Sequence, residues 1–222
     1  MISLAPAKTL EMYGLDKTPL TEYMTEWIGH ISTSQAITQW SLYFNGNTVN
    51  TAMGAGTLYL VIFTIKSLLN DMPGLFGFSA VGQYVFLLIN AFCGHQLLYN
   101  KKYAPEIAKF YPIWGLMNAL SFIIAPETMG KKWGVEGAEP DAFVTYEMKQ
   151  TGFVLATKAV YLLSLGLGVD TTKALGYGNI PALIGMVLTN FVSKEIGNFG
   201  MDSNQQWIWL LLKIFVVGSL AF

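Results

Sequence analysis

Six apolar stretches separated by short polar connectors dominate the sequence of this 222-residue chain. They cover residues 52–69, 80–98, 110–125, 152–169, 180–196 and 206–222. A helix needs about 20 apolar residues, with a lower limit of about 17, to cross the roughly 30 Å of hydrocarbon in a bilayer. We therefore predict an all-α integral membrane protein with about six short transmembrane helices, and four or five spans remain as alternatives.

The charge content supports this class. Only 12% of the residues are charged and the mean hydropathy is +0.43, whereas a soluble domain has about 25% charged residues. All 13 basic residues are lysines, and without arginine the chain has no bidentate guanidinium contacts for phosphates or guanine bases. The expected partners are the lipid bilayer and other integral-membrane subunits, and not nucleic acid.

Catalytic and metal-binding signatures are missing from the sequence. It has one cysteine and two histidines, and it lacks the phosphate-binding loop, the nucleophile elbow and the HExxH zinc motif. We therefore expect a protein that is not an enzyme, with no catalytic residues and no metal site.

Four segments follow from the distribution of charge. Residues 127–149 hold five acidic residues and three lysines with Pro140, so this part is expected to lie in water. The predicted organisation is an N-terminal arm (1–50), a first membrane half (51–126), a polar aqueous linker (127–150) and a second membrane half (151–222).

The two membrane halves share an order of elements that suggests a duplication. A shift of 99 residues places Asp71 on Asp170 and Gly77 on Gly176, although identities are few. Since each half has three spans and the linker lies in water, a duplication would give two inverted three-helix repeats. A bundle without a repeat is the other interpretation.

Helix boundaries and helix packing have local signals. Thr18 and Pro19 form a helix start, and Asn179 with Pro181 is the corresponding signal for the fifth stretch. The pairs Gly54–Gly56 and Gly166–Gly168 fall inside predicted spans, where small residues let helices approach closely. We assign these pairs to helix packing rather than to ligand binding.

The arm contains two groups of apolar residues at helical spacing within residues 18–44. Amphipathic helices at the membrane interface are expected, because tryptophan favours that position. Their polar face carries Glu22 and Glu26, which anionic headgroups repel. Docking onto a partner protein, through Trp27 and Trp40, or onto the protein's own bundle is therefore the better interpretation.

His95, near the end of the second stretch, is the most informative polar residue. An axial ligand for chlorophyll magnesium needs only one nitrogen or oxygen donor, so even this histidine-poor chain could provide it. An ordinary interfacial histidine and a proton-handling residue are the alternatives. Asn90, Gln96 and Glu195 are weaker candidates of the same kind. The 14% aromatic residues would form flat walls for chlorophyll or carotenoid, or would simply face lipid.

Three lysines lie within the apolar stretches, namely Lys66, Lys158 and Lys213. A charged side chain at the centre of a membrane helix costs about 2.5–3.5 kcal/mol on insertion scales. These lysines could simply extend their amino groups to the membrane surface (snorkelling) or pair with a partner subunit, which requires no function. The alternative is that they bind an anion.

Two functions from different classes follow. The first is a non-catalytic accessory subunit of a large membrane complex, acting in assembly or stabilisation and holding a few pigments or lipids. A photosystem-type complex of the thylakoid is the preferred parent, because of the single-ligand argument for His95. The alternative is a small inverted-repeat transporter or channel for an anionic solute, with its site near Lys158 and Lys213.

Overall fold

The computed structural model describes residues 5–12, 18–76, 80–132, 142–195 and 203–222, and these residues form helices without a strand. The all-α prediction is therefore confirmed. The long helices are α2 (Pro19–Tyr43), α3 (Val49–Leu69), α5 (Ala80–Tyr99), α6 (Ala104–Ile124), α8 (Ala142–Gly166), α9 (Thr171–Met186) with its π-helical continuation η1 (Val187–Val192), and α10 (Ser203–Ala221). The short helices are α1 (Pro6–Met12), α4 (Met72–Phe76) and α7 (Pro126–Lys132).

Four of these helices are long and apolar enough to cross a membrane: α3, α5, α6 and the continuous α9–η1 segment. This fits an integral membrane protein. The expected six spans are not confirmed, because the apolar part of α10 is shorter (Gln206–Ala221) and the stretch 152–169 belongs to a longer helix, α8. Helix α8 contains Glu147 and Lys149 in addition to Lys158, and these three charged residues lower its mean hydropathy.

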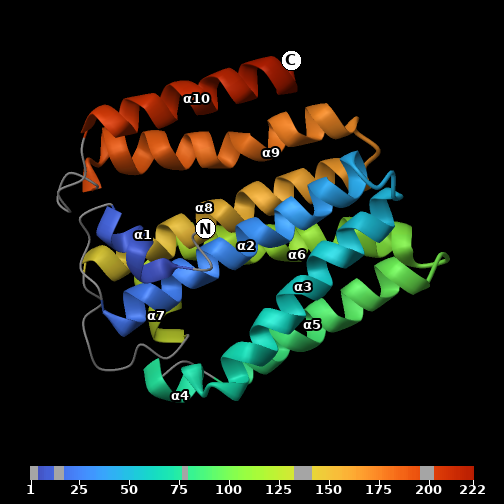
Figure 1. Ribbon diagram of the computed structural model, residues 1–222, viewed down its shortest axis with the longest axis horizontal. Coiled ribbons are helices and arrows are strands. Elements are labelled where there is room, and N and C mark those ends of the chain that lie inside the picture. Colours follow the sequence, from blue (N-terminus) through green and yellow to red (C-terminus); the bar gives the residue numbers. More distant parts are fainter. Residues whose placement is uncertain (1–4, 13–17, 77–79, 133–141, 196–202) are drawn as a thin grey trace.

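The long helices form a bundle with a central group and two flanking pairs. Helices α2, α6 and α8 lie in the middle, with α2 and α6 both against α8. The α3–α5 pair packs on α2, and the α9–α10 pair packs on α8 (Figure 1). Helix α2 therefore bridges the first pair and the rest of the bundle.

Helix α2 differs from the amphipathic interface helices that were expected. It is one continuous helix that starts at the predicted Thr18–Pro19 signal, where Thr18 and Thr21 form a capping box. Its buried residues include Thr25, Ser34 and Thr38. Thr25 and Ser34 are about two and a half turns apart, so these hydroxyl residues lie on different sides of α2, where they contact α8 and α3. Thr38 donates to the Ser34 carbonyl within the helix, whereas Thr25 and Ser34 donate to α8 and α3; small side chains of this kind allow close packing.

The glycine prediction holds at Gly56 and fails at Gly168. A Cβ atom on Gly56 would lie 2.5 Å from the carbonyl oxygen of Ser34 in α2, so α2 and α3 touch through the glycine backbone. Gly168 has φ +80° and no neighbour within 4 Å. Its amide and that of Val169 close the end of α8 on the carbonyls of Leu165 and Ser164, which is a helix C-terminal cap.

Two prolines lie inside helices. Helix α6 runs through Pro112, and the carbonyl of Ala108 therefore lacks its usual amide donor four residues on. Gly166 of α8 packs directly on this carbonyl, since a Cβ atom there would be 2.5 Å from the oxygen. Helix α9 likewise contains Pro181 and starts at the Asp170 cap, nine residues before the predicted Asn179.

The segment predicted as a polar aqueous linker, residues 127–150, contains helix at both ends. Residues 126–132 form α7 and α8 begins at Ala142, while residues 133–141 lie outside the described part. The early start of α8 follows from its charged residues, which find partners in the bundle: Glu147 accepts from Thr25, and Lys149 pairs with Glu195.

The helix lengths of the two halves correspond, but their packing does not. In the second half α9 lies between α8 and α10 and packs closely on both. In the first half α5 packs closely on α3. Helix α6 has few contacts with this pair and packs mainly on α8. The inverted repeat is therefore not confirmed.

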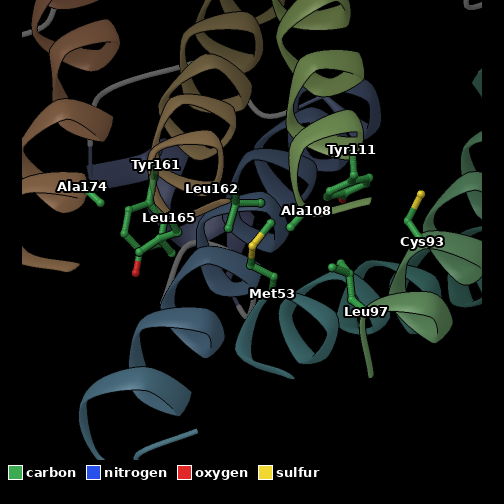
Figure 2. Packing of buried hydrophobic residues seen from close by; sticks show 9 residues of the cluster. All are labelled: Met53, Cys93, Leu97, Ala108, Tyr111, Tyr161, Leu162, Leu165 and Ala174. Carbon is green, nitrogen blue, oxygen red and sulfur yellow. The ribbon is translucent and has the colours of Figure 1, made fainter. Parts of the chain in front are cut away.

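The apolar core lies where the central helices meet the α3–α5 pair. Figure 2 shows Met53 beside Leu162, with Cys93 on one side and Tyr161 and Ala174 on the other. Each of these side chains is at most 1% exposed. The core ties α3 and α5 to α8 and α9.

Candidate functional site

Lys158 of α8 is buried in the centre of the bundle, at 4% exposure. Its Nζ donates to Ser34 Oγ of α2 at 2.7 Å, and Ser34 Oγ donates in turn to the carbonyl of Gly56 in α3 at 2.6 Å. The same Nζ lies 5.8 Å from the ring centroid of Tyr111 in α6, within cation–π range. The contacts of Lys158 and of its partner Ser34 thus connect four helices: α8, α2, α3 and α6.

The network extends to α5 through Tyr111. Its hydroxyl donates to Asn90 Oδ1 at 2.7 Å, and Asn90 Nδ2 donates to the carbonyl of Phe86 at 2.7 Å. Both polar atoms of the buried Asn90 amide are therefore used inside the protein. Its role as a pigment ligand stays a prediction, although the structure gives the Asn90 amide partners inside the protein.

Lys213 does not join Lys158. Its Nζ donates to Asn179 Oδ1 at 2.8 Å, which links α10 to α9. The two lysines therefore have different partners on different helices, and the structure does not bring them together as the two sides of one anion site.

A second polar group lies between α2 and α3 and was missed from the sequence. Lys66 Nζ and Glu26 Oε1 are 2.6 Å apart, and His30 Nε2 is 3.4 Å from the same oxygen. The other ring nitrogen, Nδ1, is 2.6 Å from Tyr59 Oη, and the ring stacks on Phe63. The four-residue spacing of Glu26 and His30 was the available signal, since such pairs face each other on a helix.

Glu147 is a third buried polar residue that the sequence analysis placed in water. It is 5% exposed and its Oε1 accepts from Thr25 Oγ1 at 2.9 Å. Its second oxygen, Oε2, is buried without a hydrogen-bond partner among the described residues. No signal in the sequence pointed to this contact, because the two residues are 122 positions apart.

The predicted ligand His95 lies on the outside of α5. The side chain is exposed and its ring is 5.2 Å from that of Tyr99. Leu88, Phe92 and Tyr99 are exposed on the same helix. They lie seven and three residues before His95 and four residues after it, and therefore on the same side of the helix. The imidazole thus stands in a row of outward apolar side chains.

Neither of the other two predicted ligands is grouped with His95 into one site. Gln96 Oε1 accepts from Asn100 Nδ2 at 2.8 Å near the end of α5. Glu195 forms an ion pair with Lys149 at 2.8 Å beside α8. In the part of the chain that the structure describes, no three His, Cys, Asp or Glu residues are grouped as metal ligands.

The two predicted docking tryptophans lie in different surroundings. Trp27 packs edge-on against Phe63 of α3 and Phe86 of α5, with centroid distances of 4.8 and 5.4 Å. Trp40 is 60% exposed and its ring lies 4.4 Å from that of Phe44. The 13 residues between the tryptophans correspond to about 20 Å along the helix. Trp40 alone remains free to meet a partner, so partner docking stays a prediction for Trp40.

Neither a family model, nor a curated protein, nor a solved structure matches this chain. The functional argument therefore depends on the geometry described above.

Proposed function

We propose that this protein is a non-catalytic accessory subunit of a larger membrane complex, which it joins through the outward side of α5. The exposed imidazole of His95, in line with Leu88, Phe92 and Tyr99, is the observation that supports this most. His95 lies near the end of α5, and an imidazole among apolar side chains at the edge of the hydrocarbon loses part of its hydration, which is costly. A subunit or pigment that covers this row would give the ring nitrogen a partner.

The favoured parent is a pigment-containing photosynthetic complex of the thylakoid. Chlorophyll magnesium accepts a single axial nitrogen, which His95 would provide from the outside of the bundle. The rings of Phe92 and Tyr99 lie about one turn to either side of His95 and would border a bound macrocycle. Carotenoid or lipid would then fill the adjoining apolar surface.

The opposing candidate, an anion transporter or channel with inverted repeats, has one observation in its favour. Lys158 is buried with a hydroxyl partner, Ser34, and with no carboxylate partner among the described residues. Against it, Lys213 is engaged by Asn179 elsewhere. Uptake of an anionic solute into liposomes, abolished by Lys158→Met, would support this candidate over the accessory subunit.

The accessory-subunit proposal is tested by mild extraction of the native membrane, followed by a native gel with an absorption spectrum of each band. We expect the wild-type protein in a large pigmented band and the His95→Leu variant largely released from it. Phe215→Leu, at an exposed aromatic residue of α10 away from the outward side of α5, is the matched control and should remain in the band. A small colourless wild-type band, near the monomer mass of 24.5 kDa, would refute the proposal.

A further inference from the structure

A cavity of about 100 Å³ lies among α2, α5, α6 and α8 and is partly open to the outside. Its walls are mainly apolar and aromatic. They include Trp27, Ile31, Phe86, Trp114, Phe122 and Leu155. Tyr23, whose hydroxyl is bonded to Ser67, also lines it, together with three further polar side chains: Gln83, Asn118 and Thr151.

Gln83 is the polar residue of this cavity that needs a partner. Asn118 and Thr151 donate to carbonyls one turn back in their own helices, at 2.8 and 2.9 Å. Gln83 is only 2% exposed, and its Oε1 has no hydrogen-bond partner among the described residues. A buried acceptor without a partner is rare in native proteins, so a bound molecule with a donor group fits this position.

The cavity lies toward one end of the bundle. Gln83 is in the first turn of α5 and Phe122 is in the last turn of α6, two helices that are long enough to span a membrane. The end of a span lies near the membrane interface, where the polar end of a lipid is found and from which its chain runs into the hydrocarbon.

We propose that this cavity binds the hydroxyl end of a linear aliphatic lipid, that is, a long-chain alcohol. The hydroxyl donates to Gln83 Oε1, and the first methylene groups lie between Trp27 and Trp114. At about 100 Å³ and partly open, the cavity has room for the first methylene groups of a chain that continues outward. The rest of the chain leaves through the opening into the bilayer.

An uncharged head group follows from the lining. None of the residues that line the cavity is a lysine or a histidine, and a carboxylate there would be a buried charge without a counter-ion. A hydroxyl satisfies the amide without this cost. The site uses different side chains from the His95 row and does not depend on the proposed accessory role.

The cavity has two tryptophans that can report binding. The test uses the full chain in detergent micelles, with the other four tryptophans changed to phenylalanine: Trp40, Trp133, Trp207 and Trp209. The probe is 5,6-dibromododecan-1-ol, whose bromines quench tryptophan on contact, and the matched compound is its methyl ether, which has no donor.

We expect saturable quenching by the alcohol, with about 3- to 10-fold weaker binding of the ether, the effect of one hydrogen bond. Gln83→Leu should reduce alcohol binding to the level of the ether and leave ether binding unchanged. Gln96→Leu, the same change at a residue of α5 that is bonded to Asn100, should bind both compounds as the wild type does.

Filling the cavity gives a second, independent test. A Cβ atom on Gly115 would meet Ala159 at 3.6 Å, an ordinary contact, so Gly115→Leu should be accommodated and should abolish saturable quenching by both compounds. Quenching of the wild type that does not saturate, or that is equal for alcohol and ether, would overturn the proposal even if both variants failed to fold.

Discussion

Replacing Gly56 by alanine tests the close backbone contact between α2 and α3. The new methyl carbon would lie 2.5 Å from the Ser34 carbonyl oxygen and closer still to Thr38 Oγ1. Non-bonded carbon atoms settle at about 3.5–4.0 Å, and contacts to oxygen are only slightly shorter, so α2 and α3 must separate by about 1 Å. The Ser34 carbonyl is backbone and cannot rotate away.

The cost has two parts. Overpacking of a tight interface costs about 1–3 kcal/mol, and the separation also weakens the bond from Ser34 Oγ to the Gly56 carbonyl, at about 0.6 kcal/mol for a typical membrane-helix hydrogen bond. A loss of about 2–3 kcal/mol corresponds to about 4–12 °C in the unfolding midpoint for a chain of this size. Thermal unfolding in detergent, followed by circular dichroism, measures it.

The matched control is Gly218→Ala in α10, where the added methyl group meets nothing within 4 Å. It should leave the midpoint unchanged or slightly raised, because alanine is the better helix former. Adding Thr38→Ala to Gly56→Ala should restore only part of the loss, since the backbone clash remains. A Gly56→Ala variant as stable as the control would show that α2 does not pack on α3 as described.

Three further changes test the polar network. Lys158→Met should raise the unfolding midpoint, by an amount equal to about 1–3 kcal/mol, because it removes a buried ammonium with no carboxylate partner among the described residues; a lower midpoint would mean that the charge is compensated. Tyr111→Phe should cost about 0.6–1.7 kcal/mol in the same assay, since Asn90 Oδ1 loses its donor, and an unchanged midpoint would contradict the bond. Lys66→Ala should cost less than about 1 kcal/mol, because Lys66 is 56% exposed in its pair with Glu26, and unfolding at low and high salt should show this small effect fade with salt.

Helix α2 illustrates what sequence reasoning could and could not reach. The start at Thr18 and Pro19 was predictable, because a capping hydroxyl and a proline at the first turn are local signals. The apolar residues around Trp27 suggested an amphipathic surface helix. Hydroxyl residues on different sides of the helix, Thr25, Ser34 and Thr38, instead carry contacts to α8 and α3, and small residues within a helix were a signal of close packing that the apolar pattern obscured.

In the candidate sites, too, some features could be predicted from the sequence and others could not. His95 and its outward neighbours can be placed from helical spacing once the helix is known. The partners of Lys158 and Glu147 cannot, because Ser34 and Thr25 are more than 120 residues away in the chain. The cavity beside Gln83 likewise depends on α2 and α8, which are distant in sequence from each other and from the consecutive helices α5 and α6.

The sequence by itself determined the all-helical class and the presence of apolar helices long enough for a membrane. Both follow from local properties, since a helix satisfies its backbone hydrogen bonds within one segment and the apolar run sets its length. The tertiary structure alone decided which sides of the helices meet, and so whether Asn90 is used internally while His95 remains exposed. In a chain that is apolar on nearly every helix face, packing depends on small residues and on a few buried polar bonds, and these are defined only when distant helices come together.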